Sequence, residues 1–431
     1  MRRAIVWFKT NLRLNDNECL QKALADNDEI ISVYCFDDAQ FEKTKFGFHK
    51  TGSFRANFLL ESLANLEEQL KALGSSLLIV KGLPETEIYN IAEEFKVQKV
   101  YAEQEFAFEE IETEKRVKNA LNKINCYFHT FNTRNLIDHP DLPFDVSQTP
   151  DVFTTYRKLI EESLCIRPLI PKPLSIKSPP FKSNIWPTLA KLNLELVKED
   201  HRAAIKFVGG ATEGNKRMYN YFYTTHALAN YKETRNGMVG SDYSTKFSAW
   251  LSLGCLSPRE IYHELKNYES QFGANASTYW VFFELLWRDY FGLVFKKYGK
   301  LFFLKSGIKS EVTNLSKHND NTLNLWINGK TGNNFIDANM LELKFTGFMS
   351  NRGRQNVASN LCNELKLDWR YGASYFEQQL IDYDVCSNWG NWAYLAGVGN
   401  DPRKNRYFNL QKQALTYDTN FLYRNLWLQK N

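Results

Sequence analysis

Short apolar runs alternate with helical patterns through the first third of the chain. Five runs of apolar or β-branched residues predict strands, and three of the segments between them repeat apolar residues at the spacing of an amphipathic helix. Strands that alternate with helices are joined by crossover connections, and these connections produce a parallel sheet. We therefore expect residues 1–135 to form a doubly wound α/β domain, with strands at 3–8, 29–35, 75–81, 98–102 and 125–131 and helices at 53–73, 84–95 and 108–123.

The pattern changes in a proline-rich stretch that follows Cys165. Six of the twelve prolines fall within RPLIPKPLSIKSPPFKSNIWP, and proline is excluded from helix interiors and central strands. This composition predicts a long connector over the surface, which we assign to residues 136–200. Helical periodicity then dominates to the end of the chain, so we expect residues 201–431 to form an all-α domain.

Charge and aromatic residues are divided unevenly between the two halves. Residues 1–200 have 26 Lys and Arg against 30 Asp and Glu, whereas residues 201–431 have 28 against 19. The basic excess of the second half fits either a nucleic-acid face or a solvated surface. Eight of the ten tryptophans follow residue 249, which fits either an aromatic core or a site for a flat ligand.

The seven cysteines are scattered, odd in number and never spaced as CxxC. This pattern predicts neither a disulfide framework nor a zinc site, and we expect no metal site. The N-terminus has no long apolar stretch after its two arginines, and no apolar run reaches the length of a membrane span. We expect a soluble, cytoplasmic monomer with no membrane partner.

The loop after the first strand reads KTNLRLNDN and contains no GxGxxG. A dinucleotide site in the first domain is therefore not expected. Arg13 and Asn15 in this loop stand at the carboxyl end of a strand, where they could contact a ligand or could as easily be capping groups.

A cluster of hydroxyl groups lies in SDYSTKFSAWLSLGCLSP, residues 241–258. Ser244, Thr245, Lys246 and Ser248 place three hydroxyls and a cation just before a predicted helix. Such a group suits a phosphate or pyrophosphate, although hydroxyl residues before a helix are also common caps.

Charged and aromatic side chains share a helical face in TYWVFFELLWRDYFGLVF, residues 278–295. Glu284, Trp287 and Arg288 are three and four residues apart, and a Glu–Arg pair at this spacing is also a routine helix stabiliser. A ring between a carboxylate and a guanidinium could instead hold a nucleobase by its face and its edge.

The segment 346–394 places polar groups where a core helix would place aliphatic ones. Asn351 shares a helical face with Arg354 and Gln355, and an Arg354–Asp382 pair could be structural. Buried polar groups need partners, so this composition also suggests a pocket. Its tryptophans, Trp369 and Trp392, could be core residues or an electron relay to a redox cofactor.

Long ordered motifs in the second half resemble the photolyase/cryptochrome family, and specifically its cryptochrome-DASH branch. They are STKFSAWLSLGCLSPREIYHEL, ELLWRDYF, GKTGNNFIDANMLEL, TGFMSNRGRQNVAS, LDWRYG and QLIDYDVCSNWGNWAYLAGVGNDP. The N-terminal domain resembles the antenna domain of the same family. The resemblance implies an α/β domain joined by a long connector to a helical domain that buries a U-shaped FAD.

The matching positions imply roles for individual residues. Asn388 would face flavin N5, where an amide can donate in one redox state and accept in another. Trp392 and Trp369 would be the proximal and middle members of a relay. The positions that match FAD contacts are Tyr231, Ser244, Thr245, Lys246, Phe247, Ser248, Arg288, Arg354, Asp382, Asp384 and Asn388. The positions that match substrate and DNA contacts are Arg235, Glu284, Trp287, Asn351, Arg352, Gln355 and Tyr394.

Two further features bear on the branch and one departs from the family. Gln355 and Tyr394 resemble the DASH branch, whose members act mainly on single-stranded DNA. In AEQEFAFEEIE, Glu109 or Glu110 would contact the pterin edge of a 5,10-methenyltetrahydrofolate antenna. Ser316 stands near the place of the distal tryptophan, so either another aromatic residue ends the relay or photoreduction is weaker.

The resemblance to this family implies a light-driven lyase that splits cyclobutane pyrimidine dimers. An electron from excited reduced FAD would enter the dimer and return after splitting, and Glu284 would stabilise the developing charge. Single-stranded DNA is the expected substrate, with duplex DNA bound weakly. The alternatives are a non-catalytic blue-light receptor with the same flavin and a light-independent single-strand binding protein.

Overall fold

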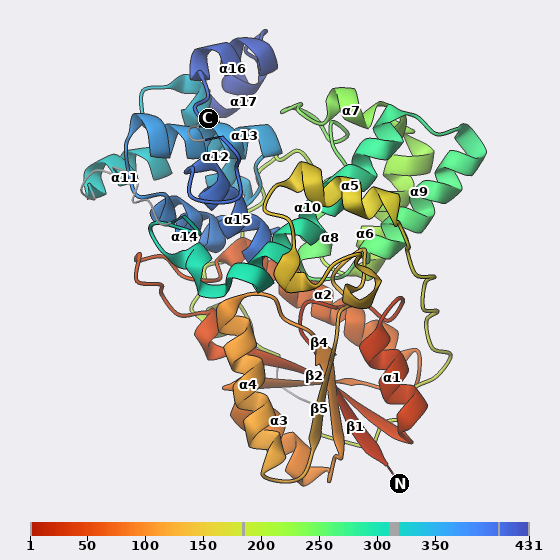
Figure 1. The fold of residues 1–431 in the computed structure, drawn as a ribbon. Helices are drawn as coiled ribbons and strands as arrows, with labels where there is room; N and C mark the ends of the chain where they lie inside the picture. The colour runs from red at the N-terminus through yellow and green to blue at the C-terminus, as the bar shows by residue number, and fades with distance from the viewer. Residues whose placement is uncertain (1, 183–185, 310–318, 404–405, 430–431) are drawn as a thin grey trace.

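The computed structural model describes residues 2–182, 186–309, 319–403 and 406–429 (Figure 1). A five-stranded sheet in the order β3-β2-β1-β4-β5 forms the N-terminal region, and all its pairings are parallel. Its strands are β1 (Arg3–Phe8), β2 (Glu29–Asp37), β3 (Leu77–Gly82), β4 (Lys99–Glu103) and β5 (Tyr127–Phe131). The doubly wound α/β fold expected from the alternating pattern is confirmed.

Both faces of this sheet are covered, as the apolar character of its strands requires. Successive residues of β1 point to opposite faces, so Val6 and Phe8 join one core cluster while Ile5 and Trp7 join another. The covering helices are α1 (Glu18–Asp26), α2 (Ser53–Lys71), α3 (Pro84–Glu94) and α4 (Phe108–Asn122). Helix α1 was not predicted, because it is short and shows only three buried residues.

The connector contains a helix that the sequence analysis did not predict. Helix α5 (Phe153–Glu162) buries Phe153, Tyr156 and Ile160, which lie three and four residues apart on one face. After it, residues 164–182 form neither helix nor strand, as proline predicts. The expected domain limits of 135 and 200 remain predictions.

The C-terminal region is helical, and the described residues after 200 contain no strand. The long helix α10 runs through it and buries most of its residues from Val281 onward. The helices are α6 (Ala211–Tyr219), α7 (Tyr231–Thr234), α8 (Ser248–Ser252), α9 (Pro258–Phe272), α10 (Ala276–Tyr298), α11 (Asp320–Ile327), α12 (Asn334–Thr346), α13 (Asn351–Ser359), α14 (Trp369–Gln379), α15 (Val385–Leu395), α16 (Leu410–Tyr417) and α17 (Leu422–Leu428). The all-α expectation is therefore confirmed.

The loop after β1 joins the α/β region to the helical region. Arg13 is buried and donates to the carbonyls of Gly254 (2.9 Å), Asp16 (2.9 Å) and Thr133 (2.8 Å), which lie in three separate segments. Gly254 has φ +63°, and a Cβ atom there would lie 1.9 Å from the Thr10 carbonyl oxygen. Arg13 is therefore a bridge between the two regions rather than a capping group.

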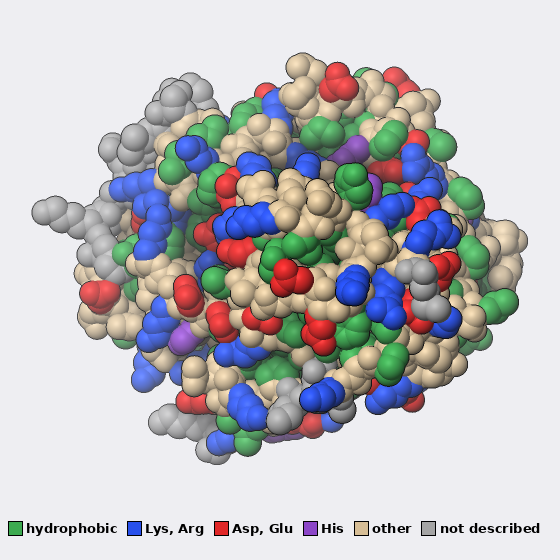
Figure 2. Space-filling model, turned by 90° about the horizontal axis from the view of Figure 1, so that it is seen from below, with side chains coloured by type: hydrophobic (Ala, Val, Ile, Leu, Met, Phe, Trp, Pro, Cys, Tyr) green, Lys and Arg blue, Asp and Glu red, His purple; other side chains and the backbone are tan. Residues whose placement is uncertain are grey.

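The face seen from below Figure 1 mixes charges of both signs. Figure 2 shows Lys and Arg side chains interspersed with Asp and Glu over this face, so the basic excess of the sequence is not gathered there. No helix among the described residues is long and apolar enough to cross a membrane.

Candidate active site

A cavity lies among the helices of the C-terminal region, walled by α7, the loop before α8, α10, α13 and α15. It brings together residues from the separate motifs that the sequence analysis singled out. The predicted site residues that line it are Tyr231, Arg235, Ser244, Thr245, Lys246, Phe247, Ser248, Glu284, Trp287, Arg288, Asn351, Arg354, Asp382 and Asp384. We call this space the central cavity.

A smaller cavity shares part of the same wall. Asn351, Arg354, Asp382 and Asp384 line both spaces, so the two cavities adjoin each other. Gln355, Asn388 and Trp392 are the predicted residues that line only the smaller one.

Asn388 is held in place by one hydrogen bond. Its Nδ2 donates to the Ala373 carbonyl at 3.0 Å, and the residue is only 8% exposed. The remaining N–H and the carbonyl oxygen of the amide have no other protein partner among the recorded hydrogen bonds of the described residues. One donor and one acceptor are thus left for a ligand.

The hydroxyl-rich loop before α8 places a buried cation in the central cavity. Lys246 is 3% exposed, donates to the Ser241 carbonyl at 2.7 Å and lies over the Tyr243 ring. Burial, and then the charge of Arg217, lower the pKa of Lys246 to about 7. An anionic ligand in this cavity would supply the missing counter-charge, as the phosphate expectation requires.

Arg354 and Asp382 form the pair that the sequence suggested. The Arg354 guanidinium donates through Nη2 to both Asp382 carboxylate oxygens, at 3.0 and 2.8 Å, and through Nε to the Met349 carbonyl. The Asp382 side chain is 1% exposed. This pair fixes a charged wall where α13 meets the loop before α15.

Asp384 is engaged with arginines of two regions. It caps α15 by accepting from the Ser387 N–H at 2.8 Å and pairs with Arg134 from the α/β side. Burial raises its pKa, but Arg134 and Arg288 outweigh burial, and the pKa of Asp384 is lowered. Arg288 itself donates to the carbonyls of Arg134 and Leu251, which leaves it fewer donors for a cofactor.

Glu284 and Arg235 face each other at the wall of the central cavity. Their carboxylate and guanidinium are paired, with side chains 33% and 21% exposed. Burial raises the pKa of Glu284, and Arg235 opposes that rise. Two residues predicted to contact the substrate and the DNA are therefore partners of one another in the structure.

Trp287 is held by aromatic neighbours. Its ring stacks on Phe153 of α5 with centroids 3.7 Å apart and an interplanar angle of 11°. Tyr394 meets Trp287 edge-on at 6.1 Å and accepts a hydrogen bond from Arg406 at 2.9 Å. Tyr394 thus lies behind Trp287 and does not itself line either cavity.

Arg352 lies beside the cavities rather than in their walls. It donates to the Gln355 side chain at 2.8 Å and to Asn236 at 3.0 Å, and its guanidinium lies over the Tyr417 ring. Burial lowers its pKa, and Arg235 and Arg406 add to this effect despite the opposing effect of Tyr417. Three guanidiniums therefore lie close together near the site.

The two relay candidates are buried and have different aromatic neighbours. Trp392 lies 5.1 Å from Phe376 and 6.2 Å from Trp326, centroid to centroid. Trp369 lies 5.7 Å from Trp389 and donates to the Lys305 carbonyl. The predicted gap at Ser316 falls outside the described residues.

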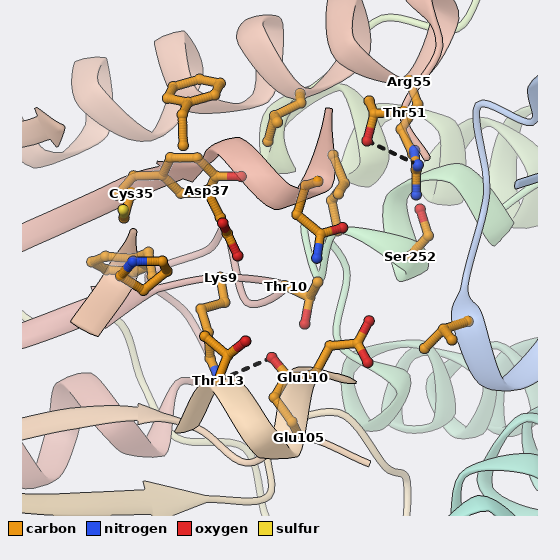
Figure 3. Close-up of a pocket in the computed structure, with 18 of the residues that line it drawn as sticks. Lys9, Thr10, Cys35, Asp37, Thr51, Arg55, Glu105, Glu110, Thr113 and Ser252 are labelled. Atoms are coloured by element: carbon orange, nitrogen blue, oxygen red, sulfur yellow. Dashed lines mark hydrogen bonds and ion pairs between the residues drawn. The ribbon is translucent and has the colours of Figure 1, made fainter. Parts of the chain in front are cut away.

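A third cavity, between the α/β region and the helical region, lies at the carboxyl ends of β1 and β2 (Figure 3). Ligands of doubly wound sheets bind at this edge. Lys9 pairs with Glu105, which also lines the cavity (Figure 3), and with Glu114, and each distance is 2.9 Å. Ser252, Leu253 and Tyr383 close it from the helical side.

The two adjacent glutamates of the antenna prediction lie differently. Glu110 lines this cavity, and its Oε2 is buried without a hydrogen-bond partner. Burial, with Glu105 adding to it, raises the pKa of Glu110 to about 8. Glu109 is instead exposed and pairs with Lys50 at 2.5 Å, so only Glu110 is placed to meet a ligand there.

Several residues of these sites were not singled out from the sequence. Arg134 comes from the α/β side and Phe153 from the connector, and their distance along the chain from the helical motifs hid them. Lys9 and Asp37 stand at strand ends, a position that could have identified them. Arg406 follows the recognised motifs without a pattern of its own.

Comparison with known proteins identifies both regions. The family model for DNA photolyase matches residues 4–174, and the model for the FAD binding domain of DNA photolyase matches residues 280–430. Curated proteins named cryptochrome DASH are similar along nearly the whole chain. The protein from Synechocystis is 46% identical over 98% of this chain and 87% of its own length, and that from Danio rerio is 46% identical over 99% and 83%.

Solved structures agree with the sequence comparison. The Synechocystis cryptochrome superposes with a TM-score of 0.96 at 46% identity, covering 99% of this chain and 89% of that chain. A class III photolyase from Agrobacterium tumefaciens gives 0.83 at 26% identity over 99% and 86%.

Proposed function

The chain belongs to the photolyase/cryptochrome family and groups with its cryptochrome DASH members, and on this basis we propose that it splits cyclobutane pyrimidine dimers with light, preferentially in single-stranded DNA. The observation that carries this proposal is the convergence of two predicted residue sets on two adjoining cavities. Arg354 and Asp382 line both cavities, Asn388 lines the smaller one, and Glu284 and Trp287 line the central cavity. A cofactor and a flat substrate could therefore meet there.

The residues present fit FAD. Lys246 is a buried cation next to the hydroxyls of Ser244 and Thr245, which suits the phosphates. Asn388 keeps a donor and an acceptor free, which suits the flavin ring edge. When bound, FAD supplies the light-excited electron donor.

On the substrate side, the protein orients and stabilises. Trp287, fixed by its stack on Phe153, offers a face for a flipped pyrimidine dimer. In its protonated form, which burial favours, Glu284 would donate a hydrogen bond to the dimer as negative charge develops on it, and Arg235 would balance that charge. The Asp382–Arg354 pair keeps the cofactor wall rigid while this happens.

The single-strand preference rests on Gln355 and Tyr394. Unstacking costs about a few kcal/mol per flipped base, and apolar contacts in the pocket would offset this cost best. Gln355 and Tyr394 are both more polar than such residues. The Tyr394 hydroxyl moreover accepts a hydrogen bond from Arg406, and the Tyr394 ring contacts the site only by meeting the Trp287 ring edge-on. A dimer in a single strand loses less stacking when it flips into the cavity, so the free-energy cost of flipping is lower.

We further propose that the third cavity holds a 5,10-methenyltetrahydrofolate antenna. The unpartnered Glu110 oxygen is a buried acceptor aimed at that space, and a pterin edge supplies matching donors. Glu105, also in the wall, is a second carboxylate for the same edge.

The deciding experiment irradiates dimer-containing oligonucleotides, single-stranded and duplex, with the purified, reduced protein. Dimer loss that depends on light and is faster in single strands would support the proposal. Equal loss in both would remove the preference, and no loss in either would favour a blue-light receptor. Protein that lacks flavin absorption would exclude both flavin functions.

A further inference from the structure

One indole close to the central cavity has no role in the site described above. Trp280 is half-buried on α10, one turn before Glu284. The Arg235 guanidinium lies over its ring, 4.4 Å from the centroid, while it also pairs with Glu284 at the cavity wall. Trp280 in turn packs on Phe283, 4.4 Å away. Arg235 is thus held from two sides in one orientation.

Resting on the proposed function, we propose that Trp280 and Arg235 form a stacking platform for the nucleobase that neighbours the dimer in a single strand. The Arg235 side chain stays 21% exposed, so a base can extend the stack on the open side of the guanidinium. Rings and guanidinium planes accept any base, because every base has a π face. The platform would therefore bind without reading sequence.

The spacing along α10 suits a strand that enters the cavity. Trp280 and Trp287 are seven residues apart, which is two helical turns and about 10 Å along the axis. Trp287 already stacks on Phe153 at the cavity wall. A dimer at Trp287 would leave its neighbouring nucleotide within reach of Trp280.

The charges around the platform favour a nucleic acid over an apolar partner. Arg235 and Arg406 lie close enough to Arg352 for their charges to lower its pKa. Arg352 and Arg406 also lie over aromatic rings, those of Tyr417 and Tyr394. Arg235 and Arg406 are paired with Glu284 and Asp401, so the excess positive charge of this group is centred on Arg352, and it would attract a phosphate that flanks a flipped dimer.

The platform distinguishes single strands from duplexes. In a duplex the neighbouring base is paired and stacked, and it reaches Trp280 only after that pair opens. In a single strand it is already free. Stacking on the platform would therefore add to the preference for single strands beyond what the cavity provides.

The test measures binding of the FAD-loaded protein to dimer-containing single strands in which the nucleotide before or after the dimer is abasic. We expect wild type to bind one abasic strand about 5- to 100-fold more weakly than the intact strand, the worth of one base stack. Trp280→Leu should bind the intact strand more weakly than wild type by the same factor, and its affinity should not change when the neighbouring nucleotide is abasic. Trp280→Tyr, which keeps a ring, should remain sensitive.

Tyr127→Leu is the matched control, because Tyr127 is an aromatic residue on β5 that is 66% exposed. It should behave as wild type. Wild type that binds intact and abasic strands equally, while still preferring dimers, would overturn the platform alone. Trp280→Leu that stays sensitive to the abasic site would also overturn it. A protein that shows no preference for dimers over undamaged strands would overturn the proposed function, and the platform with it.

Discussion

The guanidinium of Arg259 lies 2.8 Å from the carboxylate of Asp16, and the two side chains are 5% and 0% exposed. Asp16 belongs to the loop after β1, whereas Arg259 lies in the first turn of α9, so the pair joins the two regions of the protein. Ser257 donates to the same carboxylate. Each charge is thus satisfied only while the other region is in place.

We expect Asp16→Ala to lower the free energy of unfolding by about 3–5 kcal/mol, because Arg259 would be left buried and unpaired. Urea unfolding followed by tryptophan fluorescence measures this loss. Asp28→Ala is the control, since Asp28 pairs with Arg2 at an exposed site and should lower the free energy of unfolding much less. Equal effects of the two substitutions would show that the buried pair has no special weight.

Asp382→Asn should release the cofactor. The Arg354 guanidinium would lose the charge of the carboxylate that it contacts through both oxygens. The wall that the central cavity and the smaller cavity share would then be held less firmly. We expect flavin retention in the purified protein, read from its absorption spectrum, to fall at least roughly tenfold, as loss of a charge-assisted bond of about 1.5–3 kcal/mol implies. Asp418→Asn breaks a similarly buried pair with Arg424 that lines neither cavity, and this variant should keep its flavin.

Glu284→Ala should impair repair more than cofactor binding. Removing a hydrogen bond to the charged dimer should slow splitting roughly 10- to 100-fold, while flavin content stays near wild type. Flavin absorbance and the rate of light-driven dimer loss are measured on the same preparation. If both fall together, Glu284 supports the fold rather than the reaction.

Glu110 should make stability depend on pH. Burial raises its pKa to about 8 from 4.5, so between these values the folded protein binds more protons than the unfolded chain. The stability contributed by the neutral form is therefore complete below about pH 4.5 and lost as pH rises through about 8.

Glu110→Gln stays neutral and should lose less stability than wild type when pH is raised from about 6 to about 9, a difference on the order of a few °C in Tm. Thermal unfolding at several pH values provides the comparison. Glu109→Gln, at the exposed neighbouring position, should keep the wild-type profile. Parallel profiles for wild type and Glu110→Gln would contradict the assignment.

Trp392→Phe should remove most of the light-driven reduction of oxidised flavin. Trp392 lines the smaller cavity beside Asn388, where we propose that the flavin ring binds, so it would be the first electron donor to the flavin. Reduction is followed by absorbance under blue light with an external thiol present. In Trp427→Phe, which changes a separate core cluster, the flavin should be reduced at the wild-type rate. Unchanged rates in Trp392→Phe would make this indole a core residue only.

Much of the fold followed from the sequence because its signals are local. The apolar runs matched β1 to β5 within a few residues, and the periodic segments matched α2, α3 and α4. Helix α1 escaped because it is only nine residues long, and helix α5 because it is only ten residues long with a polar majority.

The site was harder to predict, because it depends on contacts between distant segments. The family motifs identified Arg354 and Asp382, whose pairing the structure confirms. They could not place Phe153 under Trp287, since α5 lies in the connector. Nor could they separate Glu110 from Glu109, because burial distinguishes these neighbours and their residue type does not.

The glycine at position 254 has a consequence for how this sequence can change. Thr10 lines the third cavity from one region, and Ser252 and Leu253 line it from the other. Any side chain at 254 would push against the Thr10 carbonyl, from which its Cβ would be only 1.9 Å away. A descendant of this protein that lost Gly254 would therefore have to move its two regions apart. The size of ligand that the third cavity can admit thus depends on a residue that forms no part of its wall.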